Sequence, residues 1–123
     1  MKGILIDVYN ESVRQVEVDD KDTLQSMYKH IRCSLVDRVS INDHDDIWVD
    51  DEGLLSLTEE SKFFTWKGYD SVLAGNGLIL GIDGMGESID PRITVDEVRS
   101  KVKFHTMRSV RLQQTLDGMT NIN

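Results

Sequence analysis

The 123-residue sequence contains one cysteine, one proline and no long apolar run. A lone cysteine cannot form a disulfide within the chain, which is typical of proteins kept in a reducing compartment. No segment approaches the roughly 18 consecutive apolar residues of a membrane span. Asp7 also interrupts the apolar start where a signal peptide requires length. We therefore expect a cytoplasmic protein with no membrane partner.

Basic residues are also scarce, because 14 Lys and Arg stand against 22 Asp and Glu and give a formal net charge of −8. Direct nucleic-acid binding is not expected, since it depends on clustered Lys and Arg and this net field repels phosphate. The hydrophobic fraction of 39% and the charged fraction of 29% are those of an ordinary globular protein. The length is sufficient for one domain with its own core.

The charge is divided unevenly along the chain. Residues 1–60 carry 15 acidic and 6 basic side chains, whereas residues 61–123 carry 7 acidic and 8 basic ones. Residues 43–60 contain eight acids and no Lys or Arg, and residues 99–111 contain five bases and no acid. Two interpretations stay open. The segments are solvated faces that keep the protein in solution, or they are two binding surfaces, a layout that also permits a homo-oligomer.

Alternating apolar residues and turn signals predict a strand-rich domain. The expected strands are residues 3–9 and 13–18, which form a hairpin, residues 35–41 and 46–51, which form a second strand pair, and residues 78–82. Asp22 caps a helix that begins at Thr23, and the capping box Thr94–Glu97 begins a second helix. Residues 54–57 fit either a short strand or a helical turn. Phe104 either begins a final strand or continues the second helix.

The domain organisation follows from these elements. We expect a single α+β domain over residues 1–104, with a small mixed or antiparallel sheet and two main helices. Residues 105–123 form a C-terminal extension whose polar tail begins at Asp117. No repeat, linker or low-complexity segment divides the chain.

Aromatic residues are concentrated in one segment. Four of the eight in the chain are Phe63, Phe64, Trp66 and Tyr69. They either fill the core or form an interface. Trp48 lies between Ile47 and Val49 in an expected strand, so it faces outward if those two neighbours face inward.

No motif indicates a reaction. The glycine-rich stretch 75–86 lacks the strand-then-helix arrangement of a dinucleotide loop and predicts hairpin turns. Residues 43–46 (DHDD) lack the ligand spacing of a calcium loop and predict a solvated turn without a metal. Cys33 follows His30 without an orienting third group, which favours a small buried apolar residue over a nucleophile. We expect no enzymatic activity and no cofactor.

Six segments and two further residues together show a resemblance to a known family: Gly3–Asp7, Val13–Val18, Leu24–Ile31, Ile47–Leu54, Leu73–Gly81 followed by Asp83 and Gly86, and Thr94–Val102. In these segments the chain resembles a family of small phage- and plasmid-encoded proteins known only as a domain of unknown function. The resemblance covers about residues 1–104 and implies a mobile-element origin. It is a pattern of strands and turns, so it implies no active site. Small acidic phage proteins commonly act by binding.

The leading hypothesis is an accessory protein of a phage or other mobile element that binds and inhibits a host or anti-phage defence protein through an acidic surface. The expected residues of this surface are Asp43, Asp45, Asp46, Trp48, Asp50, Asp51 and Glu52. One alternative is a sponge that sequesters a nucleotide-derived defence messenger. Its expected ligand-binding residues are Trp66, Asn76, Arg99, Lys101, Arg108 and Arg111. Another alternative is a DNA-mimic anti-restriction protein.

Overall fold

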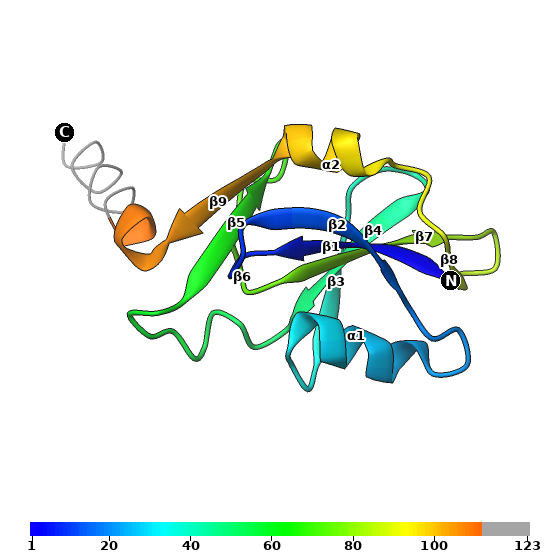
Figure 1. Ribbon diagram of the computed structural model, residues 1–123, viewed down its shortest axis with the longest axis horizontal. Helices are drawn as coiled ribbons and strands as arrows, with labels where there is room; N and C mark the ends of the chain where they lie inside the picture. Colours follow the sequence, from blue (N-terminus) through cyan, green and yellow to red (C-terminus); the bar gives the residue numbers. More distant parts are fainter. Residues whose placement is uncertain (112–123) are drawn as a thin grey trace.

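The computed structural model describes residues 1–111, whose strands and two helices form an antiparallel α+β fold (Figure 1). The strands are β1 Lys2–Asp7, β2 Ser12–Glu17, β3 Val36–Ser40, β4 Asp45–Asp50, β5 Lys62–Trp66, β6 Leu73–Ala74, β7 Gly77–Ile82, β8 Ser88–Ile89 and β9 Val102–Thr106. The helices are α1 Thr23–Ile31 and α2 Val95–Lys101, and residues 107–111 are helical after β9. The predicted α+β class is confirmed, but the described residues form two sheets and a third helical segment in addition to the two predicted helices.

The strands are divided between two sheets, where the sequence predicted one. The main sheet has the order β2-β1-β7-β4-β3, and β8 pairs with the end of β7. The smaller sheet has the order β6-β5-β9. The predicted β1–β2 and β3–β4 hairpins are confirmed, and β7 joins them at the centre by pairing with β1 on one side and β4 on the other.

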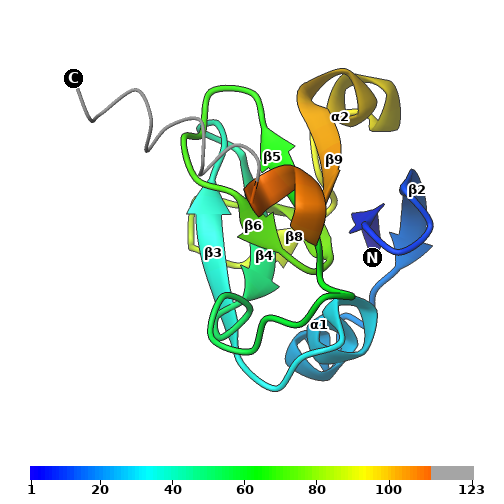
Figure 2. The same ribbon diagram turned by 90° about the vertical axis from the view of Figure 1, so that its left-hand side faces the viewer.

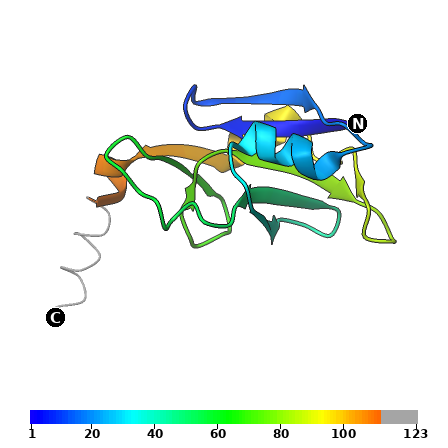
Figure 3. The same ribbon diagram turned by 90° about the horizontal axis from the view of Figure 1, so that it is seen from below.

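The main sheet is covered on both faces (Figures 1 and 3). Helix α1 covers one face, where Leu78 and Leu80 of β7 pack with Met27 of the helix. The smaller sheet and α2 cover the other face, where Ile79 belongs to one core cluster with Phe64 of β5. Because neighbouring residues of a strand point to opposite faces, the continuous apolar run of β7 serves both layers.

Local signals fix both helices. The Asp22 side chain accepts a hydrogen bond from the Gln25 N–H at 3.4 Å, and α1 ends at Arg32 in the left-handed conformation. At α2, Thr94 Oγ1 accepts from the Glu97 N–H at 3.2 Å, while the Glu97 carboxylate accepts from the Thr94 N–H at 3.3 Å. The predicted cap and capping box are therefore confirmed.

Of the alternatives left open by the sequence, the structure selects a strand for Phe104, which lies in β9. Residues 54–57 form neither a strand nor a helix but part of an irregular loop. Phe63, Phe64 and Trp66 are buried in β5, so these three aromatic residues fill the core, whereas Tyr69 is 39% exposed.

The predicted hairpin turn at residues 75–77 is wrong, because β6 pairs with β5 and not with β7. This segment carries the chain from the smaller sheet to the main one. Buried Asn76 fixes the crossing, since its Oδ1 accepts from the Val8 N–H at 2.9 Å and its Nδ2 donates to the His30 carbonyl at 3.1 Å. The second predicted turn, around Gly84, does join a hairpin, between β7 and β8.

The chain remains packed beyond residue 104. Met107 is buried in a cluster with Phe63 and Ala74 on the outer face of the smaller sheet, where Figure 2 shows the helical segment after β9 in front of β5 and β6. Residues 112–123, which include the predicted tail from Asp117, lie outside the described residues.

Candidate functional site

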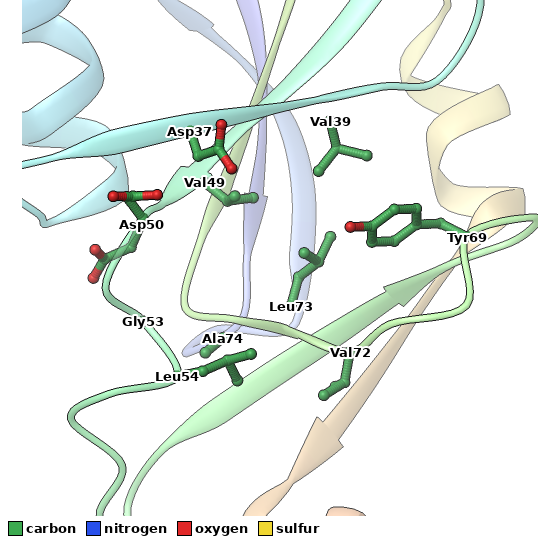
Figure 4. A pocket seen from close by; sticks show the side chains of 11 residues that line it. Asp37, Val39, Val49, Asp50, Gly53, Leu54, Tyr69, Val72, Leu73 and Ala74 are labelled. Carbon is green, nitrogen blue, oxygen red and sulfur yellow. The ribbon is translucent and has the colours of Figure 1, made fainter.

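A groove of about 160 Å³ opens between the edge hairpin β3–β4 and residues 69–74 (Figure 4). In Figure 4 the carboxylates of Asp37 and Asp50 lie on one side of the groove, and Tyr69 points its hydroxyl into it from the other side. The apolar lining comes from the hairpin, the loop after β4 and the 69–74 segment. It consists of Val39, Val49, Leu54, Val72, Leu73 and Ala74.

Strand register places three hairpin residues of the groove on one face. Asp37 pairs with Val49 across the hairpin, so the two side chains point to the same side of the sheet. Val39 lies two residues further along β3 and therefore shares this face. The result is an acidic side chain at the end of a short apolar floor.

The turn after β4 forms the mouth of the groove. Asp50 Oδ1 accepts a hydrogen bond from the Glu52 N–H at 2.9 Å, which reverses the chain after the strand. Gly53 then passes close to β6, because a Cβ at this position would lie 3.0 Å from the Ala74 carbonyl oxygen. The turn holds Asp50 and Asp51 beside the apolar lining.

The carboxylates of the groove lack a basic partner. Asp37, Asp50 and Asp51 form no ion pair with any residue between 1 and 111. The charge of Asp50 also acts on Cys33. Burial raises the pKa of the Cys33 thiol and the nearby Asp50 carboxylate raises it further, so the thiol is protonated and a poor nucleophile at neutral pH.

This arrangement suits a long basic side chain. The methylene stem of a Lys or Arg packs on apolar surface while its charged head meets carboxylates. Pockets for small organic molecules typically have volumes of about 300–1,000 Å³. A groove of about 160 Å³ is smaller and fits a protruding side chain of a partner protein better.

Two acids predicted for the binding surface are buried, and this corrects the sequence prediction. Asp45 is 1% exposed and accepts from the Arg92 N–H at 2.8 Å and the Ile93 N–H at 3.1 Å. Asp46 is buried on the other face of β4, with its carboxylate 3.8 Å from Arg38. Both carboxylates face other parts of the fold and not solvent.

The remaining acids do not form one surface. Asp43 is exposed before β4, whereas Asp50, Asp51 and Glu52 lie at the far end of this strand. A six-residue strand is about 20 Å long, so the two groups are well separated. Trp48 does face away from its two neighbours, as predicted, but α1 covers that face and Trp48 is half-buried against its core.

A comparison with protein families adds one finding. The family described as "Domain of unknown function (DUF3846)" matches residues 1–103. The chain belongs to the DUF3846 family. The resemblance to an uncharacterised domain family is thereby confirmed, and the match covers the main sheet, both helices and the groove. No curated protein and no solved structure gives a significant match.

The predicted ligand-binding residues of this DUF3846 domain are dispersed. Trp66 and Lys101 line the same hollow beside α2, but Asn76 is buried at the crossing between the sheets. Arg99 bonds to Asp96 and to the Val13 carbonyl. The other two predicted residues, Arg108 and Arg111, lie in the helical segment after β9. Arg108 is exposed there, and Arg111 forms an ion pair with Glu59. They do not converge on one ligand site.

Sequence reasoning missed Asp37 as a groove residue of the DUF3846 domain, and it named Tyr69 only as one of four aromatic residues that fill the core or form an interface. The alternation of the predicted β3–β4 hairpin, combined with its register, would have placed Asp37 beside Val49. No local signal places Tyr69, which reaches the groove through the tertiary fold. Within residues 1–111, there is no cluster of three or more His, Cys, Asp or Glu suited to a metal ion. No helix in that range is long and apolar enough to span a membrane.

Proposed function

We propose that this DUF3846 domain is a non-catalytic accessory protein of a phage or other mobile element that inhibits a host or defence protein by binding it. In this proposal the acidic groove accepts a Lys or Arg side chain of the partner. The mobile-element origin rests on the sequence resemblance described above. The binding mode rests on the geometry of the groove.

The observation that carries the proposal is the combination of charge and shape in the groove. Asp37 shares its face with the apolar floor opposite the Tyr69 hydroxyl, Asp50 lies at the mouth of the groove, and neither carboxylate forms an ion pair with a residue between 1 and 111. Carboxylates crowded together repel one another, and a basic partner relieves this repulsion. Complementary charge also accelerates association and excludes acidic competitors.

The loop beside the groove adds an apolar contact surface. Leu54 lines the groove, and Leu55 and Leu57 follow it with exposed fractions of 81% and 42%. Large apolar side chains exposed together beside a polar rim are typical of protein-binding surfaces. A basic, partly apolar segment of a partner would therefore contact both the groove and this loop.

The same observations favour the groove over a DNA mimic. A mimic of the phosphate backbone needs a long exposed row of carboxylates, because it competes for a basic DNA-binding cleft. In this chain Asp45 and Asp46 are buried in the middle of the acidic run. The exposed acids are thus split between the two ends of β4.

Affinity capture with a groove variant tests the proposal. The variant D37N/D50N/D51N removes three charges but keeps an oxygen at position 50 for the Glu52 N–H. The tagged chain is incubated with extract of its bacterial host at low and at high salt, and the captured proteins are identified by mass spectrometry. We expect a partner that the native chain retains at low salt, that the groove variant loses, and whose activity falls when the native chain is added.

A matched control carries the same change in charge at the opposite edge of the main sheet. The variant E11Q/E17Q/D20N alters three exposed acids on β2 and its flanks that form no ion pair with residues 1–111. It should retain the partner. Equal retention by the groove variant, or equal loss by both variants, would contradict the role of the groove.

Self-association stays a separate prediction, measured by light scattering of the purified chain.

A further inference from the structure

A second hollow, of about 340 Å³, lies beside α2, near the point where the end of β5 and the start of β9 meet in Figure 1. Basic and imidazole side chains line it from four separate segments of the chain. These residues are His44, Lys67, Arg92 and Lys101. They were not singled out by the sequence as a group, because they are far apart along the chain.

The fold brings these four residues together through main-chain contacts. Trp66 pairs with Val102 across the smaller sheet, and the Lys67 N–H donates to the Lys101 carbonyl at 2.9 Å, so the two lysines lie opposite each other. The Arg92 N–H donates to buried Asp45. This bond fixes the segment before α2 against the start of β4, next to His44.

The positive charges in the hollow have no acidic partner. Lys67, Arg92 and Lys101 form no ion pair with a carboxylate of residues 1–111. Two acids do line the hollow, but both have internal roles. Asp45 accepts two main-chain N–H groups, and Glu97 Oε1 accepts the N–H and hydroxyl of the capping residue of α2.

Among residues 1–111, the Arg92 guanidinium contacts a ring nitrogen and not an oxyanion. Its Nη1 lies 3.3 Å from Nε2 of His44. Guanidinium groups bind oxyanions more strongly and with two parallel hydrogen bonds. Lys67, Arg92 and Lys101 line one hollow without an ion pair to its two carboxylates, so their mutual repulsion favours the binding of an anion.

We propose that this hollow binds a small phosphate-bearing organic molecule. A phosphate presents three acceptor oxygens and up to two charges, which matches cations that approach from three segments. A single planar carboxylate is satisfied by one guanidinium. Ile41, Ile93 and the buried Trp66 supply an apolar wall beside the cations, and the volume falls within the range of small-molecule sites. This site is separate from the acidic groove and does not depend on the function proposed for it.

Tryptophan fluorescence gives a direct test, since the chain has two tryptophans and only Trp66 lines this hollow. In the variant W48F the signal comes from Trp66 alone. The probes are inorganic phosphate, pyrophosphate and adenosine monophosphate, and calorimetry with the native chain provides an independent measurement. We expect saturable binding, with adenosine monophosphate bound more tightly than inorganic phosphate.

Charge-neutralising variants locate the binding. K67Q and R92Q should each weaken adenosine monophosphate binding by about tenfold, because each removes one charge-assisted hydrogen bond. The R92Q change leaves the main-chain bond to Asp45 intact. The control K2Q/K21Q/K29Q alters three exposed lysines outside the hollow and should bind as the native chain does.

Three outcomes would overturn the proposal. Absence of binding in both fluorescence and calorimetry would exclude a phosphate site. Unchanged affinity in K67Q/R92Q/K101Q, with unfolding by urea as in the native chain, would place binding elsewhere. Equal affinity for inorganic phosphate and adenosine monophosphate would remove the role assigned to the apolar wall.

Discussion

Asp45 connects β4 to the segment that precedes α2. Its side chain is 1% exposed, and its two oxygens serve three donors. Oδ1 accepts the Arg92 N–H at 2.8 Å, while Oδ2 accepts the Ile93 N–H and the Asn42 side-chain amide, both at 3.1 Å. One carboxylate therefore holds together two segments that are almost fifty residues apart in the sequence.

The substitution D45N tests this structural role. Asparagine offers one acceptor oxygen and places an NH₂ group where the second oxygen stood, so one main-chain N–H faces another donor. A hydrogen bond to a charged group contributes about 1.5–3 kcal/mol, and an unsatisfied buried donor costs about 1–3 kcal/mol. We expect D45N to lower the free energy of unfolding by about 3 kcal/mol, a large part of the roughly 5–15 kcal/mol that stabilises a typical domain.

Urea unfolding followed by tryptophan fluorescence measures the effect. The midpoint should fall while the slope of free energy against urea stays unchanged, because the same surface is exposed on unfolding. D43N is the matched control, since Asp43 is exposed two residues earlier, and it should stay within about 0.5 kcal/mol of the native chain. A D45N variant as stable as D43N would refute the reasoning.

Three further predictions concern stability. Burial alone would raise the pKa of Asp7, but hydrogen bonds from Asn10 and Arg14 outweigh it and hold the pKa below 3.8. The ionised carboxylate stabilises the fold above pH 3.8, and this contribution is lost as the pH falls through the lowered pKa. The free energy of unfolding of D7N should therefore depend less steeply on pH below about pH 4 than that of the native chain. Burial, and to a lesser extent the charge of Lys103, lowers the pKa of His105 below 6.5. The free energy of unfolding should therefore fall as the pH drops below about 6.5, and it should fall less in H105Q than in the native chain. G77A should cost about 1–3 kcal/mol, because its Cβ would lie 2.8 Å from buried Phe64.

Urea unfolding at several pH values checks the first two of these predictions, and unfolding at neutral pH checks the third. If the free energy of unfolding of D7N fell as steeply with decreasing pH as that of the native chain, this would contradict the role of Asp7. Identical pH dependence in H105Q and the native chain would do the same for His105. A G77A variant as stable as the native chain would show that Phe64 has room to move.

Local patterns predicted much of the fold. Alternation between apolar and polar residues identified the β1–β2 hairpin and the β3–β4 pair, because both hairpins join neighbouring segments by short turns. Side-chain capping identified α1 and α2, since a cap depends on residues within one helical turn. Family membership was also recognisable from the segments that form these elements.

The candidate site was predicted only in part. Asp50 and Asp51 were identified by the run of acids, and both line the groove. Asp45 looked like its neighbours in the sequence, but the segment before α2 covers it and supplies main-chain donors. Burial of a charged side chain depends on such a distant partner, so composition could not separate Asp45 from the exposed acids.

The sequence by itself determined the scarcity of cysteine and basic residues, the split in charge and the short-range elements, because each depends on residues close together in the chain. Only the tertiary structure decided that β5, β6 and β9 form a second sheet, since their pairing joins residues as far apart as Lys62 and Thr106. That second sheet carries Tyr69 to the groove and sets Lys67 opposite Lys101. The physical reason is that long-range pairing is selected by burial of the whole core, which no local window contains.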